Sequence, residues 1–315
     1  MDKVYLNNDL YETASHWNEL TREQLLKLTE LMGDVTNLNE FMVKLWLDML
    51  EFKVLKQREE IIENQVYFYL WKKTEQFKVP HIHTESAYHY VTATIKDKVY
   101  LISSQDLHFA ASHLRWLFTE KMEGQDIIEN TFVLHSRLTK NLIPDLTHNK
   151  VKYYGPANAL TNLTWAEYIF TETYFSRYEK TKNPKWRDLF FAVIYRQSKT
   201  EKEINSNDFN GDKRIPFNPA KTEERVKELK SLSETYKNAS LLFYEGCRAF
   251  IAKKFPYTFT VGGGSDDDAF QTMNELTITI KNEINEPLDN IRESLLYDML
   301  NILENLAKRR KPDNK

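Results

Sequence analysis

Two histidines and a glutamate alternate along one short segment, as His81, His83 and Glu85. Alternate residues of an extended chain face the same way, so these three side chains would converge on one side. Imidazole nitrogens and a carboxylate are ligands that zinc accepts, and three further histidines would be available to complete the shell: His89, His108 and His113. The spacing suggests a metal site, whereas the plainer interpretation is a run of structural or solvent-exposed histidines.

This segment also resembles the HxHxDH run of metallo-β-lactamase-type hydrolases. Glu85 stands in the position of the aspartate of that run, and Ser86 stands in the position of its last histidine. The resemblance implies a metal-dependent hydrolase that uses His81, His83 and Glu85. We keep this activity as an alternative, because the later ligands and glycine-rich context of that family are not visible in the sequence.

The remaining reactive side chains favour structure over chemistry. Glu167, Glu172 and Glu179 fall on one predicted helix without the Glu-x-x-His motif of a di-iron site, so we expect a solvated acidic face. Cys247 is the only cysteine, which excludes a disulfide and a cysteine-based zinc site. We expect it to be a buried thiol, beside a glycine, Gly246, that lets another helix pack closely. The sequence therefore favours a non-enzymatic protein without a cofactor.

Composition limits the partners. The 315 residues carry a formal net charge of −3, so we expect no binding to nucleic acid through bulk electrostatics. No apolar run reaches the roughly 18 residues that span a bilayer, and the N-terminal residues lack the apolar region of a signal peptide. These features predict a cytoplasmic protein that does not enter a membrane.

The elements that would position these residues are mostly helices, since the chain has only 8 Gly and 9 Pro. Two capping boxes begin helices, Thr21 with Gln24 and Thr164 with Glu167. Helical spacing continues over several further segments, among them 38–55 and 59–73, while strand-like residues occupy 88–95, 98–103, 132–138 and 151–154. The predicted fold is mainly α with a small antiparallel β-sheet, an α+β class.

Glycine residues mark the expected domain boundary. Gly262, Gly263 and Gly264 precede Ser265 and three aspartates, a composition typical of a flexible linker. We predict a mainly helical body over 1–260 with a β-hairpin insertion near 81–103, a linker over 261–268, a helical hairpin over 269–308 and a basic tail over 309–315.

Several short segments of the sequence are similar to segments of uncharacterised proteins of tailed-phage and prophage-like gene clusters. These segments are Trp17–Thr21, Lys140–Pro144, Tyr153–Pro156, Asn162–Tyr168, Arg214–Phe217 and Leu242–Arg248. A capped helix followed by repeated leucines, with a helical C-terminus, also resembles tail assembly chaperones. That resemblance implies a helical, non-enzymatic protein that holds a tape measure protein before the tail polymerises. It supplies no catalytic residues.

The C-terminal helices are the expected contact for such a client. Their apolar side chains recur at spacings of three or four: Phe270, Met273, Leu276, Ile280, Leu288, Ile291, Leu295 and Met299. An amphipathic hairpin of this kind docks either on its own body or on a partner. A virion structural component, such as a head–tail connector, is a third interpretation, and the sequence does not set the oligomeric state.

Overall fold

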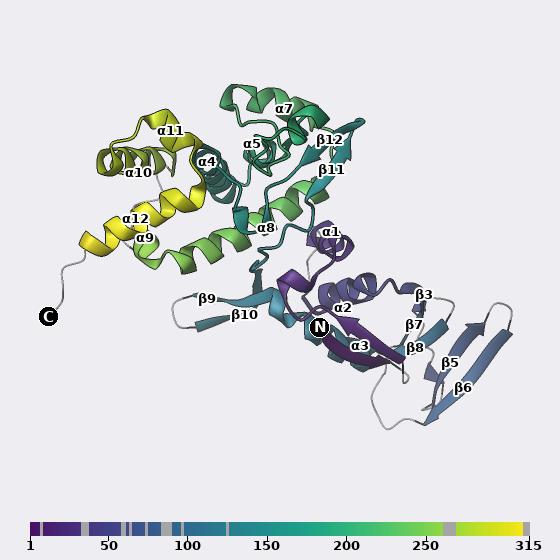
Figure 1. Ribbon diagram of the computed structural model, residues 1–315. Coiled ribbons are helices and arrows are strands. Elements are labelled where there is room, and N and C mark those ends of the chain that lie inside the picture. The colour runs from purple at the N-terminus through teal and green to yellow at the C-terminus, as the bar shows by residue number, and fades with distance from the viewer. Residues whose placement is uncertain are drawn as a thin grey trace. The chain divides into compact units, whose positions relative to one another are not determined.

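The computed structural model describes residues 1–6, 9–32, 38–57, 61–62, 65–72, 75–82, 90–95, 98–123, 126–260 and 269–310 (Figure 1). The chain divides into two compact units, residues 1–135 and 136–315. The boundary predicted from the glycines, 261–268, lies outside the described residues, and helices 269–310 belong to the second unit.

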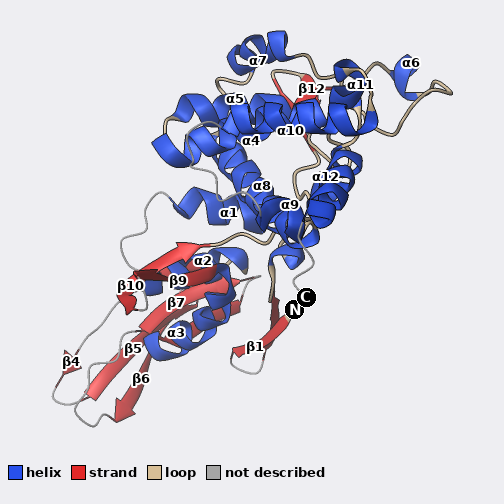
Figure 2. Ribbon diagram, turned by 90° about the vertical axis from the view of Figure 1, so that its left-hand side faces the viewer, coloured by secondary structure: helices blue, strands red, loops and turns tan. Residues whose placement is uncertain are grey.

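Antiparallel strands dominate the first unit, and Figure 2 shows them in red. β1 (Asp2–Leu6) pairs with β2 (Asp9–Thr13), and β9 (Phe118–Glu123) pairs with β10 (Asp126–Leu134). One three-stranded sheet has the order β3 (Lys53–Gln57), β7 (Tyr90–Ile95) and β8 (Lys98–Ser103). Another has the order β4 (Ile61–Ile62), β5 (Gln65–Lys72) and β6 (Glu75–Ile82). The helices are α1 (Arg22–Leu31), α2 (Leu38–Met49) and α3 (Ser104–Ser112), with short 3-10 turns at Trp17–Glu19 and His113–Leu117.

Several local predictions for this unit are confirmed. Thr21 and Gln24 form the capping box that begins α1, and the predicted hairpin is β7 and β8, with Ile95 opposite Lys98. The predicted helix over 59–73 is wrong, because most of that segment is strand β5, whose eight residues pair with β6. Its Val, Tyr, Phe and Trp residues favour a pleated strand, and this preference prevailed over the helical spacing.

Helices dominate the second unit, which also contains one small sheet in the order β11-β12-β13. These strands are Asp145–His148, Val151–Tyr154 and Arg196–Gln197. The helices are α4 (Trp165–Thr181), α5 (Pro184–Ile194), α6 (Glu201–Ile204), α7 (Thr222–Glu228), α8 (Glu234–Lys254), α9 (Pro256–Thr260), α10 (Ala269–Ile284), α11 (Leu288–Glu293) and α12 (Leu296–Arg310). Short 3-10 turns lie at Asn158–Leu160 and Pro219–Lys221. The predicted class, mainly α with small antiparallel sheets, is confirmed.

Helix α8 passes very close to an extended segment of its own unit. A Cβ atom added at Gly246 would lie 2.3 Å from both the backbone nitrogen and the oxygen of Leu138. Only glycine allows that approach, and the neighbouring Cys247 is fully buried. The close packing predicted at Gly246 is therefore present, although the partner is an extended segment rather than a helix.

The C-terminal helices pack on α4. The indole nitrogen of Trp165 donates a buried hydrogen bond of 2.8 Å to the Thr277 hydroxyl on α10. A backbone bridge joins Thr164 to Leu295, with Trp165 N–H donating to Ser294 O and Leu296 N–H donating to Leu163 O, both at 2.8 Å. This bridge separates α11 from α12, so the second arm of the helical hairpin predicted over 269–308 is two helices. Of the helices that the structure describes, none combines the length and the apolar character that a membrane span requires.

Candidate functional site

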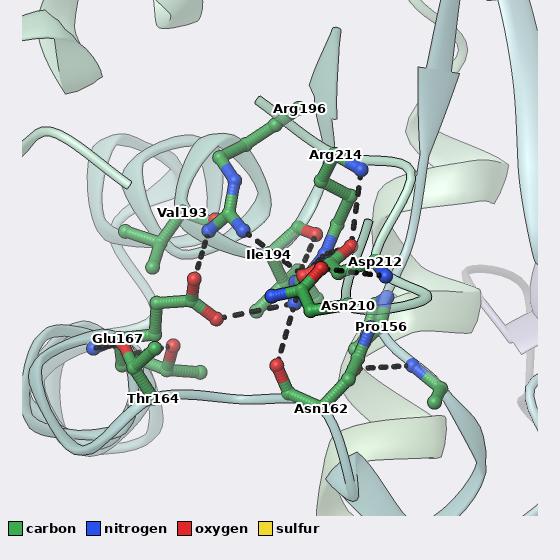
Figure 3. A network of polar contacts seen from close by, with 12 residues as sticks. Pro156, Asn162, Thr164, Glu167, Val193, Ile194, Arg196, Asn210, Asp212 and Arg214 are labelled. Atoms are coloured by element: carbon green, nitrogen blue, oxygen red, sulfur yellow. Dashed lines mark hydrogen bonds and ion pairs between the residues drawn. The ribbon is translucent and has the colours of Figure 1, made fainter. Parts of the chain in front are cut away.

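Helix α4 carries a buried glutamate at its first turn. Thr164 caps the helix by accepting a hydrogen bond from the Glu167 N–H at 3.3 Å. The Glu167 carboxylate does not complete a capping box, because it contacts two arginines instead: Arg196 Nη1 lies 2.6 Å away and Arg214 Nη2 lies 3.3 Å away (Figure 3). The predicted solvated acidic face is wrong at this position, since Glu167 is only 2% exposed.

The two arginines come from segments that the small sheet brings together. Arg196 begins β13, separated by one residue from the end of α5, whose residues 189–194 are all buried, and it pairs with Tyr154 of β12. Arg214 forms a backbone bridge with Ser198, two residues beyond Arg196. The sheet therefore places both guanidinium groups beside the first turn of α4.

A second carboxylate closes the cluster. Asp212 accepts hydrogen bonds from Arg214 Nε at 2.9 Å and Nη2 at 2.7 Å, a bidentate arrangement, and lies 3.7 Å from Arg196 Nη2. Backbone carbonyls accept further hydrogen bonds from the guanidinium groups. Arg214 Nη2 donates to Asn162 O at 3.0 Å, and Arg196 Nη1 donates to Val193 O at 3.4 Å. Two cations face two anions, so the buried cluster is electrically neutral.

Burial and pairing act in opposite directions on these groups. Burial lowers the pKa of Arg196 to about 10, against the raising effect of Glu167. Burial also acts to lower the pKa of Arg214, but Glu167 and Asp212 outweigh it and raise that pKa. For Asp212, burial acts to raise the pKa, and the hydrogen bonds and charge of Arg214 hold it below its usual range. The Asp212 carboxylate is thus held as an ion, which suits a fixed junction better than proton transfer.

A second glutamate of α4 has a related arrangement. Glu172 accepts hydrogen bonds from the Tyr244 hydroxyl at 2.8 Å and from Arg248 Nε at 2.8 Å, both on α8. Burial, followed by the charge of Glu172, raises the pKa of Tyr244 well above its usual value. Glu172 is buried, so the solvated acidic face is wrong here too, whereas Glu179 is exposed as predicted. The buried thiol predicted at Cys247 is confirmed, and burial raises its pKa.

The residues predicted to bind a metal are only partly described. His81 lies on β6 opposite Val66, and His83 and Glu85 lie outside the described residues. His108 is exposed on α3, and His113 Nδ1 is 3.5 Å from the Asp2 carboxylate. Over the part of the chain that is described, no three His, Cys, Asp or Glu side chains cluster to hold a metal. The site at His81, His83 and Glu85 remains a prediction.

The residues predicted to contact a partner divide into two sets. Ile280, Ile291 and Met299 are buried within the second unit. Leu295 is 47% exposed, while three others are half-buried: Met273, Leu276 and Leu288. Phe270 lies on α10. The C-terminal helices thus use one part of their apolar set on their own unit and leave another part facing outward.

The Glu167 cluster was not predicted, although the sequence held two signals for it. Glu167 lies among Trp165, Tyr168 and Ile169, which are core residues, and Arg196 follows a long apolar run. A charge inside such a run must find a partner. Comparison of the chain with family models, with curated proteins and with solved structures finds no match in any of the three. Function must therefore be inferred from the geometry of the described residues.

Proposed function

We propose that this chain is a non-enzymatic interaction protein, of the tail assembly chaperone kind, that binds a helical protein client through the outward side chains of its C-terminal helices. The supporting observation is that two large apolar side chains are largely exposed on a firmly held support: Leu295, between α11 and α12, is 47% exposed, and Ile278, on α10, is 52% exposed. Exposed apolar groups on a rigid support bind with little loss of conformational entropy.

The rigidity of that support follows from several contacts. Leu295 is itself the residue whose backbone bridges to Thr164, and Ile278 follows Thr277, which bonds to Trp165 inside the core. Glu304 on α12 accepts hydrogen bonds from the N–H groups of Tyr257 and Thr258, at 3.3 and 2.8 Å, and so fixes α12 to the start of α9. The Glu167 and Glu172 junctions hold α4, on which the C-terminal helices rest.

Co-expression tests this function. The chain, carrying an affinity tag, is produced with the longest helical protein encoded beside its gene, which is the expected tape measure, and complexes are isolated by size-exclusion chromatography. We expect a complex with the wild type and its loss in Leu295→Asp and Ile278→Asp, since each places a charge in an apolar contact.

Asn282→Asp provides the matched control, because it adds the same charge at an exposed position of α10. Circular dichroism confirms that each variant is folded. The proposal is abandoned if the wild type forms no complex, or if Leu295→Asp and Ile278→Asp bind as well as Asn282→Asp.

A further inference from the structure

A row of partly exposed aromatic rings, here called the aromatic strip, links three segments of the second unit: Phe217, Phe170, Tyr174 and Trp186. The centroids of successive rings are 5.4, 6.1 and 6.0 Å apart. Phe170 and Tyr174 are one turn apart on α4, and Trp186 lies on α5, with its ring stacked at 21° to that of Tyr174. Each ring contacts the next, so the strip forms one connected surface.

Cations lie over the end of the strip nearest the α4–α5 turn. The Arg177 guanidinium is 4.9 Å from the Trp186 ring centroid, and Lys185 Nζ is 5.4 Å from the same centroid. Lys182 Nζ lies 5.3 Å from the centroid of the neighbouring Tyr178 ring. Cation–π attraction at this distance holds the charged groups against the rings.

The surface charge at this end is mainly positive. Four exposed cations gather on the turn: Arg177, Lys180, Lys182 and Lys185. Exposed carboxylates nearby include Glu179, which pairs with Lys182 at 2.9 Å, Glu223, whose charge acts on Tyr174, and Glu234, which pairs with Arg187. An excess of positive charge beside apolar rings matches a ligand that carries carboxylates beside apolar groups.

We propose that the aromatic strip and its cations bind an acidic amphipathic segment of a partner protein. Trp, Tyr and Arg are the residue types that supply most of the binding energy at protein interfaces. The Arg177 guanidinium already lies over the Trp186 ring, and this contact reduces the entropy cost of pairing it with a carboxylate. A nucleic acid base that stacked on Trp186 would compete with Arg177 and Lys185, which already lie over that ring.

Fluorescence anisotropy with the full chain tests this surface. The probe is a labelled 20-residue amphipathic peptide with glutamate on the polar face and leucine on the apolar face. We expect it to bind, with a Kd that rises with salt between 50 and 300 mM, because screening weakens contacts between exposed charges. A matched peptide with lysine in place of glutamate, and labelled oligo(dT), should bind at least ten-fold more weakly.

The variant Arg177→Glu with Lys185→Glu reverses two cations and should weaken the acidic peptide at least ten-fold. Its control, Lys253→Glu with Lys281→Glu, makes the same change at exposed positions of α8 and α10 and should bind like the wild type. Binding of the acidic peptide that is no tighter than that of the lysine peptide or of oligo(dT) overturns the proposal, as does equal loss in both double variants. The salt dependence and peptide comparison use the wild type, so they decide the matter even if the double variant does not fold. Because no client is needed, the result is separate from that for Leu295 and Ile278.

Discussion

Two glutamates of α4, five residues apart, meet arginines in different surroundings. Glu167 faces Arg196 and Arg214, both of which are 1% exposed. Glu172 faces Arg248, whose side chain is 51% exposed although its hydrogen bonds to Glu172 are equally short. The first junction is enclosed on all sides by protein, whereas the second reaches the surface through its cation.

This difference should decide how much each junction contributes to stability. An arginine that loses its carboxylate partner in the interior is left charged without solvent, which typically costs about 3–5 kcal/mol. An arginine that is half exposed turns to water instead, and an exposed pair contributes about 1 kcal/mol or less. Equal distances therefore do not imply equal energies, and each of the following variants tests this comparison.

The largest effect is expected for Glu167→Gln. It leaves two buried guanidinium groups with one carboxylate, Asp212, so we expect a loss of about 3–5 kcal/mol in the free energy of unfolding of the second unit. Urea denaturation measures this loss, and hydrogen exchange should show faster exchange at the start of α4 and in β13. The control is Glu179→Gln on the exposed face of α4, which should change stability by less than about 0.5 kcal/mol.

A smaller loss is expected for Glu172→Gln. The amide oxygen still accepts from Tyr244, and Arg248 turns to solvent, so we expect about 1–2 kcal/mol, within the range for a hydrogen bond to a charged group. The same urea titration measures it. A loss as large as that of Glu167→Gln would show that exposure of the arginine does not govern the energy, and the comparison would fail.

Lowering the pH should reduce the stability that the enclosed junction contributes through Asp212. The folded-state pKa of Asp212 is depressed, so its stabilisation is fully present above the unfolded-state pKa, about 3.9, and is lost as pH falls through the lower folded-state value. Asp212→Asn should therefore be less stable than the wild type at pH 7. The difference between their free energies of unfolding should become smaller below pH 4. Urea midpoints between pH 7 and pH 3 check this, and a constant difference contradicts it.

The smallest effect concerns the rate at which a thiol reagent labels Cys247. This rate is measured on the folded protein. This buried thiol, the only one in the chain, should react with a thiol reagent only when α8 opens. Glu172→Gln removes an anchor of α8 and should speed labelling roughly 5- to 30-fold, the factor that 1–2 kcal/mol produces. Mass spectrometry follows the reaction. Faster labelling in Glu179→Gln as well would show that the thiol does not report on this anchor.

The sequence predicted elements better than it predicted the enclosed junction. Local spacing was enough to predict strand Val151–Tyr154, the caps at Thr21 and Thr164 and the helical character of the segment after residue 269. The Glu167 cluster was not, since Arg196 and Arg214 reach Glu167 across a sheet that assembles from distant segments. Local rules read Glu167 as the end of a capping box, and its side chain pairs elsewhere because two buried cations attract it more strongly than one backbone N–H.

The strand at 65–72 was predicted wrongly for a different reason. Its residues carry both a helical spacing of apolar groups and the side chains that favour strands, and pairing with 75–82 decides between them. Such pairing is a tertiary contact that a single segment does not reveal. The docking of the C-terminal helices is similar, because Trp165 and Thr277 are 112 residues apart.

That separation has a consequence for synthesis in the cell. A ribosome adds about 5–20 residues per second, so roughly 6 to 22 s pass between the emergence of Trp165 and that of Thr277. During this interval the indole and the backbone groups of 163–165 have none of the partners that α10–α12 later supply. The nascent chain thus leaves the Trp165 indole without its α10 partner until Thr277 has been made, and that period is when general chaperones of the cell would engage it.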